Sequence, residues 1–438
     1  MAGSAPAAAT ATRSSSAGTN TNYLAPLSVL TTLFFMWGFL TSLNDILSPH
    51  LKQVFELSHL QAQFVQTAFF AAYFVMSVPS GSIVKKIGYK SGIIVGLLGA
   101  AAGCVLFYPA ASARSYPLFL LALYVLGSGI TLLQVAANPF VAVLGKPESS
   151  SSRLTLTQAF NSLGTTIGPE FGKWVFFSSA VLGAEELAKM APAALEKYKL
   201  GEAALVQTPY LVLAGALVAL AIAIAAFKLP KIEETADADA AVSGDDKHAS
   251  AWSYRHLVLG AVAIFVYVGA EVAIGNNIVS YFREPYMGGL SNADASSYVK
   301  FYWGGAMVGR FIGSLFTLRA YRPGKALAGH AIGAAALTVL SVLTTGFLGR
   351  WSLLAIGLFN SIMFPTIFTL AIDGLGRHTR QGSGILCTAI VGGALIPPVL
   401  GFFADQGALH QSFLIAAVCY VYIAWYGAKG SAPAAARA

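Results

Sequence analysis

The chain has 438 residues, of which 56% are hydrophobic and 11% are charged. Soluble domains carry about 25% charged residues, so this composition excludes a soluble globular protein and predicts a polytopic helical membrane protein. A β-barrel is excluded as well, because the short segments of alternating apolar and polar residues that form barrels are absent. The net charge of +8 does not indicate a nucleic-acid partner, because its distribution follows the loops between apolar stretches.

About twelve apolar stretches are long enough to cross a bilayer, which takes about 20 mostly apolar residues. In chain order the predicted spans are 24–48, 61–84, 91–111, 117–144, 154–179, 208–228, 256–282, 296–318, 326–347, 351–373, 382–404 and 410–427. These stretches predict an all-α membrane protein with 12 transmembrane helices in two six-helix halves.

Polar segments divide the chain into its expected parts. Residues 1–22 are rich in Ala, Ser and Thr and are expected to form a disordered tail. The acidic segment 229–254 is expected to be a cytoplasmic linker between a bundle over 23–228 and a bundle over 255–428. Residues 429–438 are expected to form a C-terminal tail.

The basic residues predict the orientation in the membrane. With an inside N-terminus, 17 of the 27 Lys and Arg residues fall on the inside and 8 on the outside, and two lie within spans. Loops on the cytoplasmic side carry the excess of Lys and Arg. We therefore expect a multi-pass protein of the cytoplasmic (inner) membrane with both termini in the cytoplasm.

One polar pattern occurs in both halves. Gln134 lies five residues before Pro139 in an apolar run, and Asn360 lies five before Pro365 in another. A polar side chain inside lipid costs several kcal/mol unless it meets a partner or a water-filled cavity. Matched polar positions therefore indicate a parallel repeat around a shared central cavity. Pro139 is also expected to bend its helix and leave backbone carbonyls for side chains or water to satisfy.

A carboxyl and an amide mark a second repeated level. Asp45 lies seven residues after Gly38, and Asn276 lies seven after Gly269. A carboxyl in a low-dielectric cavity is more easily protonated than one in water. Asp45, beside Asn44, is therefore the expected proton carrier, and the alternative is an ordinary solvated Asp at the end of the first span.

Further amides are expected to bind substrate, because an amide offers both donors and an acceptor to sugar hydroxyls. The candidate substrate-binding amides are Asn44, Gln66, Gln134, Gln158, Asn161, Asn276, Asn277 and Asn360. For each one alone, the alternative is an interhelical hydrogen bond. Phe69 and Tyr267 are the aromatic candidates, since the apolar face of a pyranose stacks on rings.

Glu271 is the second buried carboxyl. It is expected either to titrate as a second proton-coupling group or to pair with Arg310 and fix the second half. Cys104, Cys387 and Cys419 lie in apolar stretches and are expected to be core residues without disulfide or metal. No arrangement of nucleophile and base indicates an enzyme.

Several segments together resemble the fucose–galactose–glucose:proton symporter family of the major facilitator superfamily. They are Trp37-Gly38-Phe39 with Asn44-Asp45, Ala136-Ala137-Asn138-Pro139, Gln158-Ala159-Phe160-Asn161-Ser162, Val206-Gln207-Thr208-Pro209-Tyr210 and Tyr267-Val268-Gly269-Ala270-Glu271-Val272. The resemblance covers all twelve spans. It implies the major facilitator fold, in which two six-helix bundles rock about a central site, and monosaccharide uptake driven by a proton gradient.

One departure from that family concerns proton coupling. In its fucose transporters the aspartate of span 1 and a glutamate of span 4 line the cavity, and the matching positions here are Asp45 and Gln134. Gln134 does not titrate, so the resemblance favours the glucose/galactose and N-acetylglucosamine branches over fucose. It leaves Asp45 as the expected proton carrier.

The expected function is import of a hexose such as glucose or galactose, or of fucose, by proton symport through alternating access. No cofactor is expected beyond the proton gradient. The first alternative keeps the fold and couples to Na⁺, and the second is a sugar sensor that transports nothing. The expected partners are a monosaccharide and the lipid bilayer, with no nucleic acid, and the protein is expected to be monomeric.

Overall fold

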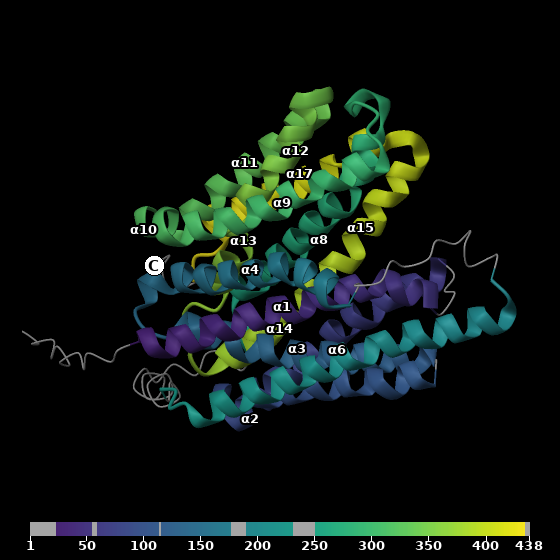
Figure 1. The fold of residues 1–438 in the computed structure, drawn as a ribbon. Coiled ribbons are helices and arrows are strands. Elements are labelled where there is room, and N and C mark those ends of the chain that lie inside the picture. Colours follow the sequence, from purple (N-terminus) through teal and green to yellow (C-terminus); the bar gives the residue numbers. More distant parts are fainter. Residues whose placement is uncertain (1–22, 55–58, 114, 177–189, 231–249, 434–438) are drawn as a thin grey trace, which may run out of the picture.

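The computed structural model describes residues 23–54, 59–113, 115–176, 190–230 and 250–433, and this part of the chain is helical without strands. The helices run along a shared direction in two packed groups (Figure 1). The first half holds α1 (Leu24–Val54), α2 (His59–Ser112), α3 (Tyr116–Val143), α4 (Ser150–Phe176) and α6 (Pro192–Ala226). The second half holds α8 (Arg255–Arg283), α9 (Asn292–Ile312), α10 (Leu318–Ala320), α11 (Pro323–Leu343), α12 (Gly346–Asn360), α13 (Met363–Ala371), α14 (Thr379–Thr388), α15 (Gly392–Phe403), α16 (Leu409–Ser412) and α17 (Leu414–Trp425).

The helix α2 contains two of the predicted spans. Its 54 residues are interrupted at Gly88, where φ is 80° and ψ is 168°. Only glycine adopts this backbone conformation readily, so the chain reverses there between the predicted spans 61–84 and 91–111. The basic residues Lys85, Lys86 and Lys90 flank this reversal.

Nine helical stretches of the described residues are long and apolar enough to cross a membrane, and one of them, Ala68–Ser112, covers most of the two-span helix α2. The predicted spans over α4 and α9 are not among the nine. Helix α4 is rich in Ser, Thr and amide residues, and α9 carries Asp294, Lys300 and Arg310. These two polar helices pack against each other at the seam between the halves. A twelve-helix major facilitator fold accounts for this arrangement.

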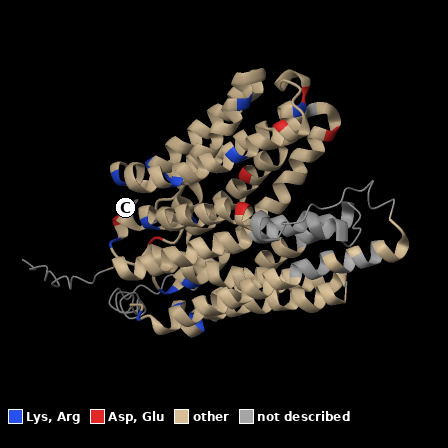
Figure 2. Ribbon diagram, in the orientation of Figure 1, with Lys and Arg blue, Asp and Glu red and all other residues tan. Residues whose placement is uncertain are grey.

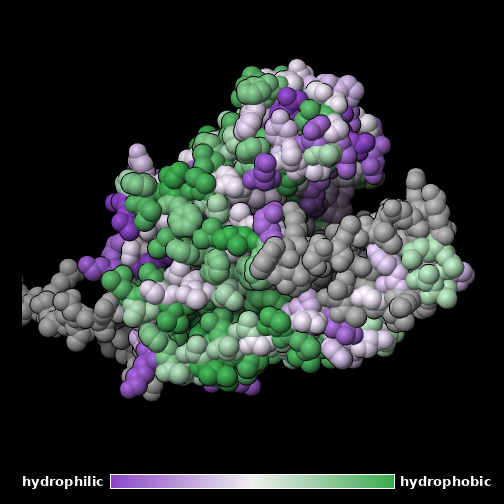
Figure 3. All heavy atoms as spheres, in the orientation of Figure 1, coloured by the Kyte–Doolittle hydropathy of each residue, from purple (hydrophilic) through white to green (hydrophobic). Residues whose placement is uncertain are grey.

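Large apolar side chains face outward around both halves, as expected of surfaces in contact with lipid. The most exposed of them include Phe74, Val212, Ile222, Phe316, Ile332, Leu343, Val418 and Val421. Hydrophobic residues cover much of the side of the molecule, and hydrophilic residues gather toward its ends (Figure 3).

Lys and Arg residues cluster at one end of the molecule, where α1, α4, α8, α11 and α14 begin (Figure 2). We call this the basic end. The two halves touch there: the Ser151 and Thr369 hydroxyls lie 2.6 Å apart, and the Arg380 guanidinium donates to the Lys85 carbonyl at 3.4 Å. Toward the opposite end, α11, α12 and α15 diverge from α2, α3 and α6 (Figure 1).

Helix packing within the second half depends on the absence of a side chain at Gly357. A Cβ added there would overlap the backbone carbonyl of Tyr302, because α12 and α9 cross in direct contact. We expect Gly357→Ala to destabilise the fold by about 1–3 kcal/mol through overpacking, seen as a lower thermal midpoint of the protein in detergent. Gly329→Ala in α11 is the matched control, since nothing lies within 4 Å of its added Cβ. Equal midpoints for the two variants would contradict this crossing.

Candidate functional site

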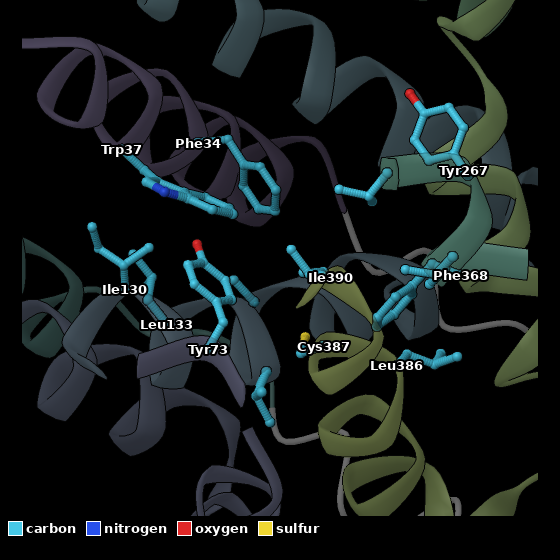
Figure 4. Packing of buried hydrophobic residues seen from close by; sticks show 14 of the residues in the cluster. Phe34, Trp37, Tyr73, Ile130, Leu133, Tyr267, Phe368, Leu386, Cys387 and Ile390 are labelled. Atoms are coloured by element: carbon cyan, nitrogen blue, oxygen red, sulfur yellow. The ribbon is translucent and has the colours of Figure 1, made fainter. Parts of the chain in front are cut away.

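The candidate site lies where the two halves face each other. Side chains from both sides approach it (Figure 4). Phe34, Trp37 and Tyr73 come from α1 and α2, and Tyr267, Phe368, Cys387 and Ile390 come from α8, α13, α14 and the turn after α14. These rings and aliphatic groups form the apolar frame around two sets of buried polar side chains, one in each half.

In the first half, three amides from α3 and α4 meet. Gln158 Nε2 donates to Asn138 Oδ1 at 3.4 Å, and both side chains are buried beside the buried Gln134. Neither Gln134 Oε1 nor Asn138 Nδ2 finds a partner among the described residues. Buried amide atoms normally form hydrogen bonds, so these two enclosed atoms require a partner that the described residues do not supply in this state.

Asn161, one turn along α4 from Gln158, is used differently. Its Nδ2 donates to the backbone carbonyl of Phe34 at 2.9 Å. This bond ties α4 to α1 across the first half, and the side chain is only partly buried. Asn161 therefore holds α1 in place beside the amide cluster, and it leaves its Oδ1 for other contacts.

In the second half, four residues from α8, α9 and α12 form a closed ring of hydrogen bonds. The Tyr267 hydroxyl lies 2.8 Å from Glu271 Oε1 and 3.2 Å from the Asn360 carbonyl. Asn360 Nδ2 donates to the Tyr302 hydroxyl at 2.9 Å, and this hydroxyl donates to the Glu271 carbonyl at 3.1 Å. The ring fixes the Glu271 carboxyl near the middle of α8 and therefore deep within the membrane-spanning part.

Two polar atoms beside this ring have no partner within the part of the chain that the structure describes. They are Asn360 Oδ1 and the hydroxyl of Tyr420 in α17, both on fully buried side chains, and the Tyr420 hydroxyl lies beside the Asn360 and Tyr302 side chains without a hydrogen bond of normal geometry to either. Together with Gln134 Oε1 and Asn138 Nδ2 they give each half a buried, unsatisfied pair. A molecule rich in hydroxyl groups has the donors and acceptors that both pairs require.

Arg310 links the two halves. Its guanidinium donates to the Ser162 hydroxyl in α4 and, through Nε at 3.3 Å, to the Ser361 carbonyl after α12. Within the described chain no ion pair joins Arg310 to Glu271, although Arg310 is the cation among the electrostatic neighbours of that carboxyl. Glu271 therefore keeps a carboxyl whose direct partner is a tyrosine rather than a guanidinium.

Other predicted residues lie apart from both polar sets. Asn276 is exposed, and Asn277 Nδ2 donates to the Ala273 carbonyl one turn back in α8 at 2.9 Å. Phe69 is partly buried and packs on Tyr73, with ring centroids 5.4 Å apart. The ring and the amide cluster do not include them.

Three predicted residues fall where side chains are not described. The backbone of Asn44 and Asp45 belongs to α1 and that of Gln66 to α2, and their side chains lie outside the described part of the structure. The proton-carrying role of Asp45 and the binding roles of Asn44 and Gln66 therefore stay predictions from the sequence.

Tyr420 is the main member of the site that the sequence reasoning missed. Its signal is a hydroxyl within the apolar run of α17, where a phenol costs free energy unless it meets a polar partner. Ser162 was missed as the partner of Arg310, since one serine in a serine-rich helix carries no distinguishing signal. No three His, Cys, Asp or Glu side chains in the described segments could share a metal ion.

A large cavity at the basic end is distinct from the candidate site. It has a volume of about 960 Å³ and opens at the basic end, where Tyr89, Arg319, Arg322, Arg377 and Arg380 are among its lining residues. The Ser151–Thr369 contact lies on its wall. The buried polar residues of the ring and the amide cluster do not line it, so we assign it to the outer face of the closed basic end.

Comparison with known proteins shows which family most of the chain matches. Residues 29–397 match the model of the Major Facilitator Superfamily. The chain is 55% identical over 410 residues to a glucose/galactose transporter of Brucella abortus (biovar 1, strain 9-941), covering 94% of this chain and 95% of that protein. It is 37% identical over 410 residues to the L-fucose-proton symporter of Escherichia coli K12, with 93% of each covered.

A solved structure gives the same fold. The crystal structure of the major facilitator transporter FucP in the outward conformation superposes with a TM-score of 0.84 at 35% sequence identity. The superposition covers 93% of this chain and 98% of that one. The two-half architecture described above is therefore shared by a related protein of known structure.

The ring in the second half predicts the effect of removing one hydroxyl. We expect Tyr302→Phe to lower stability by about 1–3 kcal/mol, because the buried Asn360 amide loses its acceptor. Tyr298→Phe in the same helix is the control, since the Tyr298 hydroxyl makes no hydrogen bond with any described residue. Thermal midpoints in detergent provide the measurement. If Tyr302→Phe is as stable as Tyr298→Phe, the ring of hydrogen bonds does not contribute to the stability of the second half.

Proposed function

Because the chain belongs to the Major Facilitator Superfamily of membrane transporters, we propose that it imports a hexose such as glucose or galactose together with a proton. It is a transporter rather than an enzyme. The observation that carries the proposal is the pair of facing polar sets, in which Gln134, Asn138, Asn360 and Tyr420 keep unsatisfied atoms inside an apolar frame. The names of its relatives, glucose/galactose transporter and L-fucose-proton symporter, support the same substrate class.

The sugar is proposed to bind between the halves. Gln134, Gln158 and Asn161 present amides from the first half, and Asn360 presents its Oδ1 from the second. Asn44, Gln66, Asn276, Asn277, Phe69 and Tyr267 complete the proposed binding set. Contacts from both halves suit a transporter, because a ligand held by both draws them together around itself.

Two carboxyls are proposed to carry the coupling. Asp45 takes the proton from the outside and releases it inside, and Glu271 is the second titrating group. Glu271 supports this role because its partly buried carboxyl contacts a neutral tyrosine hydroxyl and forms no ion pair with a described cation, so both its charged and its neutral forms have a partner. The proton-carrying role proposed for Asp45 rests on its place in the first span and on the family resemblance.

The structure is proposed to represent the outward-facing state. The halves touch at the basic end, and the related FucP structure of the same fold is described as outward. Since cytoplasmic loops carry the excess of Lys and Arg, the basic end is assigned to the cytoplasm of the inner membrane. This assignment puts both termini inside.

Proton coupling and substrate identity are tested together by recording external pH. De-energised cells that express the protein receive D-glucose, D-galactose, L-fucose, D-mannose or N-acetylglucosamine in turn. We expect alkalinisation with glucose or galactose, because each imported sugar removes a proton from the medium. If labelled sugar enters without a pH change and its entry depends on Na⁺, the coupling ion is sodium rather than the proton. Specific sugar binding without entry would indicate a sensor.

The carrier assignment has its own test. We expect Asp45→Asn to abolish gradient-driven accumulation while sparing sugar exchange, because the variant keeps the shape of the side chain and loses the titrating group. Asp294→Asn is the control, since that carboxyl is exposed in the first turn of α9 and accepts from Ser291. Uphill uptake that survives Asp45→Asn at the wild-type level would overturn the assignment.

The same transport assay distinguishes the role of Glu271 from that of Asp45. We expect Glu271→Gln to keep sugar binding and to weaken uphill accumulation by about tenfold or more, as for loss of a proton-transfer group. The amide keeps an acceptor for Tyr267, so the ring stays intact. If the pH dependence of uptake is unchanged in Glu271→Gln, Glu271 does not take part in proton coupling and Asp45 is left as the proposed carrier.

A further inference from the structure

We propose that Ser383 and Arg310 hold the basic end closed. Ser383 donates across the halves to the backbone carbonyl that Pro139 releases, and Arg310, which also donates to the carbonyl that Pro365 releases in its own half, donates across the halves to Ser162. The inference rests on the alternating access proposed above, and it concerns the opening of the basic end rather than the identity of the cargo. Its basis is a geometric coincidence between two hydrogen bonds and two prolines in equivalent positions of the halves.

The first of these carbonyls belongs to Val135. Pro139 has no N–H, so the carbonyl four residues earlier lacks its helical donor. The Ser383 hydroxyl, from α14 of the second half, donates to this Val135 carbonyl at 2.9 Å. Both residues are fully buried. A bond that normally stays within one helix is thus replaced by a bond between the halves.

The second carbonyl belongs to Ser361. Pro365 likewise removes the donor for the carbonyl four residues earlier, and Arg310 Nε donates to it at 3.3 Å. The same guanidinium reaches the first half through the Ser162 hydroxyl. The second half therefore uses an arginine to join its released carbonyl to α4.

The Ser383–Val135 bond depends on the closed state more strongly than the Ser151–Thr369 contact does. The Thr369 hydroxyl, which touches Ser151, also lies within 3.1 Å of the Pro365 and Thr366 carbonyls of its own helix. It keeps partners when the halves separate. The Val135 carbonyl has lost its helical donor to Pro139, so separation of the halves leaves this carbonyl to water or to another donor.

The released carbonyls also adjoin the proposed sugar site. Val135 follows Gln134, and Ser361 follows Asn360, in the chain. One peptide bond therefore separates each amide with an unsatisfied atom from a carbonyl that holds the basic end closed. Movement of either amide toward a ligand would move the adjoining carbonyl relative to its donor.

The chain contains a natural reporter for opening. Cys387 lies one turn from Ser383 in α14, is fully buried, and faces Tyr73 of the first half (Figure 4). Replacing Cys104 and Cys419 with Ala leaves it as the sole cysteine. In sealed vesicles, a membrane-impermeant maleimide applied separately from each side then measures how often Cys387 becomes accessible from the basic end.

The test is a double-mutant cycle. We expect Ser383→Ala to raise the labelling rate from the basic end by about three- to tenfold, as for loss of one buried hydrogen bond. In a Pro139→Ala background the restored N–H satisfies the Val135 carbonyl within α3. There Ser383→Ala should change the rate less than about twofold, given the smaller loss when the acceptor stays satisfied.

An equal increase in both backgrounds would assign Ser383 to packing or to the local thiol environment and overturn the proposal. No increase in a folded Ser383→Ala protein would also overturn it. If Ser383→Ala does not fold, Ser162→Ala carries the test, because it removes the tie between Arg310 and the first half; unchanged labelling in that variant would contradict the proposal. Labelling of Cys387 needs no sugar or gradient. Failure of the proposed sugar transport can therefore be told apart from failure of the proposed closing bonds.

Discussion

The structure depends on one constraint: a polar group inside the bilayer must find a partner within the protein. The Asn161 amide meets it by bonding to the Phe34 carbonyl, and the Tyr302 hydroxyl meets it through Asn360 and Glu271. These bonds tie helices together within each half. Among the described residues, the polar atoms left over include Gln134 Oε1, Asn138 Nδ2, Asn360 Oδ1 and the Tyr420 hydroxyl.

The same constraint explains why the least apolar helices lie at the seam. Helices α4 and α9 carry residues that lipid would penalise, including Gln158 and Arg310, and they pack against each other rather than facing outward. Hydrogen bonds across a polar seam can be exchanged for hydrogen bonds to water when the halves separate, whereas apolar contacts have no such replacement. The molecule therefore combines two stably packed bundles with a polar contact that can open.

Much of the site was visible in the sequence because intramembrane polarity is rare and therefore informative. The matched spacing of Gln134 with Pro139 and of Asn360 with Pro365 predicted a central polar level, and the structure buries both amides near the seam. The choice between partners for Glu271 was not predictable. Tyr267 lies one helical turn away, while Arg310 points to Ser162 in the other half, and side-chain direction across helices is not encoded in spacing.

The sequence by itself determined the membrane class, the twelve apolar stretches, the two-half organisation and the released carbonyls, because hydropathy and proline chemistry are local properties. The tertiary structure decided which donor satisfies each carbonyl, which amides meet, and at which end the halves touch. These features join residues from different helices, 20 positions apart for Asn138 and Gln158 and 248 positions apart for Val135 and Ser383. Their energies depend on how whole helices pack, and no local pattern records that.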